Sequence, residues 1–88
     1  MSLFKARVFV HLRPSVLDPA GEATKSAAIK LGVKGITKLR IGKSIDIDIE
    51  ASTKEEAKDQ IEMLSDRLLS NPVIENWTSE LFTEDTLV

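Results

Sequence analysis

Few side chains in this 88-residue sequence are placed to do chemistry. Asp46, Asp48 and Glu50 alternate along one apolar stretch, so a strand would put their carboxylates on one face, where they could hold a hard cation. A solvated strand face explains the same pattern more simply. His11 is the only histidine and could act as a general base, but no orienting partner accompanies it. The sequence therefore predicts no catalytic residue and no metal site.

The composition excludes further classes of site. The chain has no cysteine, which rules out disulfides, thiol nucleophiles, iron–sulfur clusters and cysteine-type zinc sites. The four glycines are isolated rather than grouped in a phosphate-binding loop. No apolar run approaches the length of about 18–20 residues that a membrane span requires. We therefore expect a soluble, cytoplasmic chain that binds no cofactor and no membrane.

The charges are divided unevenly along the chain, although the net charge is only −2. Residues 1–43 carry nine Lys or Arg and two acids, whereas residues 44–88 carry three Lys or Arg and twelve acids. The halves could pair within the chain, through Lys5 and Arg7 beside the acidic strand, or between the subunits of a homodimer. A basic surface for RNA is a third interpretation, but sheet-based RNA readers stack bases on aromatic residues, and only Phe9 is available. We expect no nucleic-acid partner.

The first third of the chain predicts a strand followed by a helix. Residues 4–12 alternate between apolar and polar and indicate a strand with one buried face. Asp18 can cap a helix over residues 19–31, because Pro19 suits the first helical position and Gly32 follows the last.

The isoleucine-rich middle of the chain allows two interpretations. A three-residue loop would make a hairpin that pairs Ile41 with Ile45 and keeps one apolar face. The same hairpin sets Leu39 opposite Ile47. Alternatively, one long strand over residues 37–50 would overhang a small domain and invite pairing with a second chain. The sequence does not decide between them.

The second half of the chain predicts another helix and a final strand. Ser52 and Glu55 form a capping box at the start of this helix. Its apolar stripe has helical spacing and consists of Ala57, Ile61, Leu64 and Leu68. Residues 73–82 form the last strand, and residues 83–88 form a tail.

The element order is that of an α+β, ferredoxin-like βαββαβ fold, with an antiparallel sheet and two helices on one face. We expect a single domain over residues 1–82. The second face of the sheet would be bare and would carry Phe9. In a chain this small such a face calls for a partner, so we expect the chain to dimerise through the sheet.

Four segments carry a family resemblance. They are Arg7-Val8-Phe9-Val10, residues 16–21 (VLDPAG), residues 39–43 (LRIGK) with the isoleucine strand after them, and residues 68–75 (LLSNPVIE). In this order and spacing they closely resemble PurS, the small subunit of phosphoribosylformylglycinamidine synthase. The resemblance covers about residues 5–80. The family usually has Gln where Ala20 stands and often Tyr where Trp77 stands.

The resemblance implies a non-catalytic subunit of a glutamine-dependent ligase of de novo purine biosynthesis. The complete enzyme converts formylglycinamide ribonucleotide, glutamine and ATP into formylglycinamidine ribonucleotide, glutamate, ADP and phosphate. A glutaminase subunit makes ammonia, and ATP and magnesium are expected on a large synthetase subunit. The small subunit, as a homodimer or tetramer, would bridge the other two and support ammonia transfer. The alternative is an ACT-type regulatory module for a small ligand, but the glycine-bearing loop of that module is missing after the first strand.

The family motifs mark a basic turn as one candidate partner interface. Arg40, Gly42 and Lys43 precede the isoleucine strand, and the two cations could grip an acidic surface. Gly42 would supply a positive φ. These residues could equally serve only as turn chemistry. Asp18 is a further candidate, although helix capping is the simpler role for it.

The last motif supplies the remaining interface candidates. Asn71 and Pro72 are expected to fix the turn into the final strand, and Glu75 is expected to contact a partner. Trp77 is the only tryptophan, and it is expected either to anchor an interface or to pack in the core.

Overall fold

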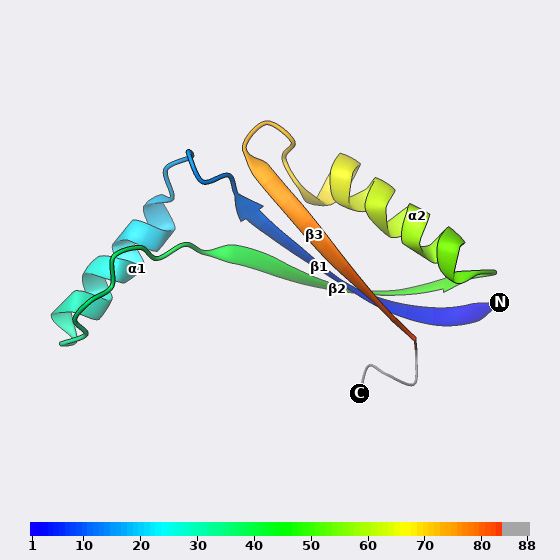
Figure 1. The fold of residues 1–88 in the computed structure, drawn as a ribbon, viewed down its shortest axis with the longest axis horizontal. Coiled ribbons are helices and arrows are strands. Elements are labelled where there is room, and N and C mark those ends of the chain that lie inside the picture. Colours follow the sequence, from blue (N-terminus) through cyan, green and yellow to red (C-terminus); the bar gives the residue numbers. More distant parts are fainter. Residues whose placement is uncertain (84–88) are drawn as a thin grey trace.

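The computed structural model describes residues 1–83 as three strands and two helices (Figure 1). The elements are β1 (Ser2–Leu12), α1 (Pro19–Lys30), β2 (Gly42–Ala51), α2 (Lys54–Leu64), the π-helical turn η1 (Ser65–Leu69) and β3 (Glu75–Thr83). The last strand includes Thr83, the first residue of the expected tail, and residues 84–88 lie outside the described residues. Neither helix within residues 1–83 is long and apolar enough to cross a membrane.

The sheet has the order β2-β1-β3, and both pairings are antiparallel, as expected for the α+β class. The predicted alternation of β1 is confirmed, because Phe4, Ala6, Val8 and Val10 are all buried on the face that α2 covers. Val8 is fully buried and lies between Ile45 of β2 and Ser79 of β3. This face of the sheet and Ile61 of α2 form the core.

The second helix begins one residue later than the sequence predicted. Ala51 still pairs with Ser2 in the sheet, so Thr53 becomes the cap, and its hydroxyl accepts a hydrogen bond of 3.0 Å from the Glu56 amide. Downstream, the π-helical turn inserts an extra residue into the helical repeat. The inserted residue moves Leu68 of the predicted stripe out to solvent and brings Leu69 against the core instead.

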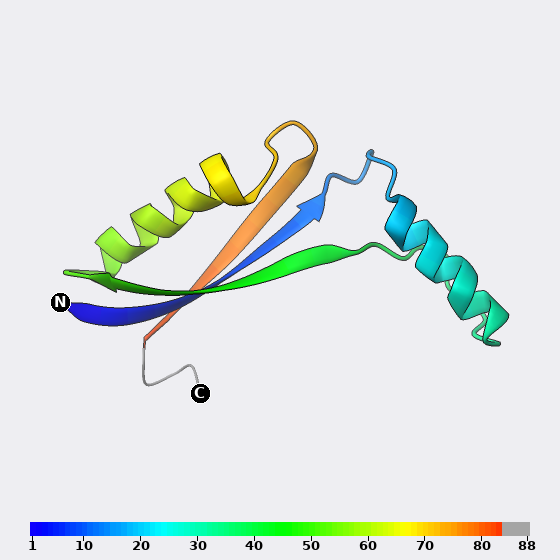
Figure 2. The ribbon, with the colours of Figure 1, turned by 180° about the vertical axis from the view of Figure 1, so that it is seen from behind.

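Only α2 covers the sheet. In Figures 1 and 2, α1 lies beyond the end of the strands, at the opposite end of the molecule from α2, and the molecule measures 51 × 31 × 14 Å. The expectation of two helices on one face is therefore corrected for α1. We call residues 17–41 the α1 arm, and β1, β2, β3, α2 and η1 the sheet body.

Residues 37–41 explain why the sheet has three strands rather than the four of a βαββαβ fold. They run back along α1, and within residues 1–83 they pair with no strand. The amide of Ile41 donates to the carboxylate of Asp18, and the carbonyl of Leu39 lies against Gly21. Because the backbone of this segment is held by α1, neither the hairpin nor a strand starting at residue 37 forms within the chain.

On the uncovered face of the sheet, basic residues of β1 lie opposite acidic residues of β2. Arg7 and Asp46 face each other across β1 and β2, and Arg7 Nε lies 2.7 Å from Asp46 Oδ1. Lys5 lies opposite Asp48 in the same ladder. The predicted placement of the opposite charges across the two strands is confirmed for both pairs, and Arg7 and Asp46 also form an ion pair.

Candidate partner-binding edge

Most of the residues that the family motifs identify lie together along one edge of the sheet body, at the ends of its strands. At this edge β1 ends while β2 and β3 begin, with His11 opposite both Gly42 and Asn76. The two chain segments that connect to the α1 arm leave from the same edge (Figure 1). We call it the junction edge, and it consists of Arg13, Asp18, residues 40–43 and residues 71–77.

Asp18 caps α1, as predicted, and also clamps the arm. It is only 4% exposed, and its Oδ1 accepts a hydrogen bond of 2.9 Å from the Gly21 amide. Its Oδ2 accepts a second bond, of 2.8 Å, from the Ile41 amide. Both hydrogen bonds stabilise the ionised carboxylate and so hold the pKa of Asp18 below its ordinary value, and the bond from the Ile41 amide has the larger effect. One carboxylate therefore ties the start of α1 to the segment that returns to β2.

Gly21 makes the clamp possible because it has no side chain. A Cβ at this position would lie 2.4 Å from the carbonyl oxygen of Leu39 and 2.7 Å from Asp18 Oδ2. Gly42 has a similar role, since a Cβ there would lie 2.8 Å from the carbonyl oxygen of Val10. Its expected positive φ is not found, because Gly42 opens β2 with extended backbone.

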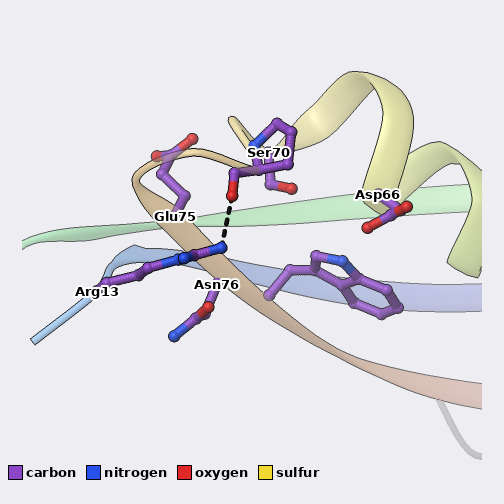
Figure 3. Close-up of a pocket in the computed structure, with 7 residues that line it drawn as sticks. Arg13, Asp66, Ser70, Glu75 and Asn76 are labelled. Atoms are coloured by element: carbon purple, nitrogen blue, oxygen red, sulfur yellow. Dashed lines mark hydrogen bonds between the residues drawn. The ribbon is translucent and has the colours of Figure 1, made fainter.

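Two arginines connect the loops of the junction edge. Arg40 donates from Nη2 to the carbonyl oxygen of Arg13, at 2.9 Å. Arg13 in turn donates from its guanidinium to the carbonyl oxygen of Pro72 (Figure 3). Arg40 therefore has a definite structural contact, and Pro72 accepts one. Sequence reasoning missed Arg13, and the signal for it was its position between the end of the first strand and Pro14.

Glu75 and Asn71 fix the turn into β3. Glu75 Oε1 accepts a hydrogen bond of 2.7 Å from the Asn71 amide, and Asn71 Oδ1 accepts one of 3.0 Å from the Val73 amide. Lys43 Nζ lies 3.8 Å from Glu75 Oε2, with the Lys43 side chain 61% exposed and that of Glu75 14% exposed. Lys43 is thus the more accessible member of this pair.

A pocket of about 250 Å³ opens beside this turn. Its walls are Arg13, Asp66, Ser70, Pro72, Glu75, Asn76 and Trp77. Trp77 is half-buried and packs against the core, which is one of the two roles considered for it, and its role as an interface anchor stays a prediction. Arg13 and Asp66 lie on opposite sides of the pocket in Figure 3. In residues 1–83 no cluster of three or more potential metal ligands is found.

Comparisons with known proteins match nearly the whole chain. The family model described as "PurS: Phosphoribosylformylglycinamidine (FGAM) synthase" matches residues 5–83. The PurS subunit of phosphoribosylformylglycinamidine synthase from Synechocystis is 45% identical over 78 residues, which are 89% of this chain and 78% of that protein. The corresponding subunit from Archaeoglobus fulgidus is 42% identical over 83% of this chain and 91% of its own.

Solved structures show the same arrangement. A chain in the PurLQS structure from Thermotoga maritima has a TM-score of 0.85 and 35% identity, covering 93% of this chain and all of that one. PurS from Methanocaldococcus jannaschii, described as a subunit of formylglycinamide ribonucleotide amidotransferase, has a TM-score of 0.79 and 31% identity. The comparison covers 91% of this chain and 96% of that one.

Proposed function

The chain belongs to the PurS family and is a subunit of phosphoribosylformylglycinamidine synthase, a ligase of purine biosynthesis, and we propose that it acts there as an assembly subunit without an active site of its own. The observation that carries the proposal is the junction edge. The polar side chains of this edge form hydrogen bonds with backbone groups, and these hydrogen bonds fix the loops of the edge. Loops held in a defined shape by hydrogen bonds are suited to docking.

In the proposed division of labour, a glutaminase subunit releases ammonia and a large synthetase subunit uses it. The synthetase subunit holds ATP and magnesium and converts formylglycinamide ribonucleotide into formylglycinamidine ribonucleotide. The PurS chain bridges the two in the cytoplasm and supports transfer of ammonia between them. The Thermotoga PurLQS structure, which contains a chain similar to this one, supports the bridging role. The ACT-type alternative is not favoured, because the PurS match spans residues 5–83.

The junction edge is the proposed contact surface for the other subunits. Lys43 is an accessible candidate, because it is the second residue of β2, its side chain is 61% exposed, and its ion pair to Glu75 is long, at 3.8 Å. Arg40, Asp18, Asn71 and Pro72 act by holding that surface in shape. Cations on a rigid surface favour an acidic partner and guide the encounter through long-range attraction.

The chain also pairs with itself, as a homodimer or a dimer of dimers. The α1 arm supports this part of the proposal, because five of its large apolar residues stay exposed within residues 1–83, namely Leu17, Ile29, Leu31, Val33 and Ile41. A helix of twelve residues is marginal in water on its own and normally gains its stability from packing against another element.

Reconstitution tests the function. The glutaminase and synthetase subunits of the same organism are assayed for formylglycinamidine ribonucleotide with and without this chain, using glutamine and then ammonia as the nitrogen source. We expect the glutamine-driven reaction to require the chain and the ammonia-driven reaction to proceed without it. Equal rates with and without the chain, for both nitrogen sources, would contradict the assembly role.

A further inference from the structure

The pocket beside the turn into β3 contains an aspartate that has no part in fixing the junction edge. The pocket has a volume of about 250 Å³, and Asp66 of η1 forms one of its walls. The ion pairs found within residues 1–83 have Arg7 and Lys43 as their cations, and neither of them binds Asp66. The next residue, Arg67, lies roughly a quarter of a turn away around the helix. The Asp66 carboxylate is therefore available to a group from another molecule.

Two buried serines fix the π-helical turn that carries Asp66. Ser65 Oγ donates to the carbonyl oxygen of Ile61 at 2.8 Å, and Ser70 Oγ donates to the carbonyl oxygen of Ser65, also at 2.8 Å. Both serines are buried. Turns of this kind interrupt the regular hydrogen bonding of an α-helix and are frequent at functional sites. The serines therefore hold the backbone of Asp66 in a defined position beside the pocket.

The surroundings of Asp66 favour a cation. Glu62 lies four residues earlier in the helix, where side chains come close, and two acids at this spacing repel each other. Glu75 adds a second carboxylate to the pocket walls. Arg13 lies on the opposite side of the pocket from Asp66 (Figure 3), and its guanidinium already donates to the carbonyl oxygen of Pro72. A positive group at Asp66 would relieve the repulsion, whereas a negative group would add to it.

Aromatic and apolar surface accompanies this carboxylate. Trp77 of β3 is half-buried and lines the pocket, so it offers an indole ring to an incoming group. Leu68 and Val73 lie within two residues of wall residues in the chain and are 72% and 76% exposed. Apolar contacts around an aromatic centre exclude water in protein interfaces. A guanidinium suits this combination, because it stacks on an indole and binds a carboxylate through two hydrogen bonds.

We propose that the pocket receives an arginine side chain from one of the partner subunits. The guanidinium binds the Asp66 carboxylate and packs against Trp77, while Leu68 and Val73 contact apolar residues around that arginine. Lys43, at the same junction edge, meets an acidic group, so two contacts of opposite sign set the orientation of the subunit. This inference rests on the proposed assembly role and names the chemistry of one of its contacts.

Matched substitutions of two exposed aspartates test the contact with intact subunits. Asp66→Asn removes the charge from the pocket, whereas Asp59→Asn removes the same charge from α2, away from the pocket walls. We expect Asp66→Asn to weaken binding of the full chain to the glutaminase and synthetase subunits about tenfold or more, because a charged hydrogen bond is lost. Asp59→Asn should change the dissociation constant by no more than about threefold. Equal effects of the two variants, measured by surface plasmon resonance, would overturn the proposal.

A small probe tests the chemistry of the pocket directly. Because Trp77 is the only tryptophan, its indole N–H gives a single NMR signal. N-acetyl-arginine amide is titrated into the nitrogen-15-enriched chain, and N-acetyl-glutamate amide serves as the probe of opposite charge. We expect the arginine probe to shift the indole signal and the amides of residues 66–70, and Asp66→Asn to abolish these shifts. A response to the glutamate probe instead, or no response of the indole to either probe, would overturn the proposal.

The outcomes separate this inference from the proposed function. If glutamine-driven activity requires the chain while Asp66→Asn binds the subunits as tightly as the wild type, the arginine contact is rejected and the assembly role stands. If the chain affects neither nitrogen source, the assembly role is rejected, and with it the partner subunits as the source of the arginine. The titration with the arginine probe judges the chemistry of the pocket independently of that assay.

Discussion

The sheet body and the α1 arm belong to the same chain but are held in shape by different kinds of interaction. In the body, Val8 and Ile61 are almost fully buried between the sheet and α2, so the body has a core within one copy. In the arm, polar contacts fix the shape: Asp18 binds two amides, and Lys25 donates to the carbonyl oxygen of Thr37 at 3.1 Å. The arm therefore has a defined geometry without a core of its own.

The difference shows how a small subunit can prepare a surface for assembly. Burial of apolar area is the main stabilising contribution in the body. The arm keeps several large apolar side chains exposed within the described residues, where a second chain could cover them. Substitutions should accordingly have separable effects, with those in the body lowering the stability of each copy and those in the arm lowering the stability of the pair.

The largest expected effect is in the body. Ile61→Ala removes buried aliphatic contacts and should reduce the free energy of unfolding by about 2–5 kcal/mol. The matched substitution in the arm, Leu31→Ala, should change it by no more than about 0.5 kcal/mol at concentrations where the chain is monomeric. Thermal or urea unfolding of both variants checks the contrast, and similar losses would mean that the arm has a core within the single chain.

The second-largest effect is expected where the returning segment, residues 37–41, contacts α1. Gly21→Ala places a methyl group against the carbonyl oxygen of Leu39, so we expect the returning segment to separate from α1 and dimerisation to weaken. The free energy of unfolding of the sheet body should change little. Amide hydrogen exchange at Ile41 measures the opening, with Ser26→Ala as the control on the outer side of α1. Unchanged protection of Ile41 in Gly21→Ala would show that the clamp tolerates the methyl group.

The pH dependence of the arm should follow Asp18. Because its pKa is lowered in the folded chain, its contribution to stability is complete above the ordinary Asp pKa of about 3.9 and is lost as pH falls through the lower, folded value. The amide shifts of Gly21 and Ile41 should therefore titrate together below pH 3.9, as recorded by NMR. Asp18→Asn should abolish this shared titration, and independent midpoints for the two amides would contradict a single clamping carboxylate.

The smallest effect on stability is expected at the surface cation of the junction edge. Lys43→Ala removes a long, exposed ion pair, so the melting temperature should stay close to that of the wild type. Binding of the partner subunits should weaken and should become less sensitive to salt. Lys54→Ala, which removes an exposed lysine at the start of α2, is the control. A loss of stability without a loss of binding would make Lys43 a purely structural residue.

The sequence was sufficient for local structure but not for the place of α1. Alternation in β1 and capping at Asp18 are local signals, and both were read correctly. The position of α1 depends on where residues 37–41 bind, and that is decided by hydrogen bonds to Asp18 and by the space at Gly21. The spacing of the apolar residues did not indicate the π-helical turn, which places Leu69 rather than Leu68 against the core.

The junction edge was predicted in part, because the motifs identified its residues without their partners. Asn71 and Pro72 do hold the turn into β3, as expected for residues that fix its geometry. The contact between Arg40 and Arg13 joins segments 27 residues apart, and no local pattern indicates it. Whether Glu75 or Trp77 contacts a partner stays a prediction, since each has an internal role within the described residues.

Amide hydrogen exchange as a function of chain concentration tests the difference between body and arm most directly. The measurement compares residues 19–41 with β1 and α2, below and above the dissociation constant of the dimer. We predict that protection in the body is the same at both concentrations, whereas protection in the arm rises as the dimer forms. An arm that is already fully protected in the monomer, or one that stays unprotected in the dimer, would contradict the account.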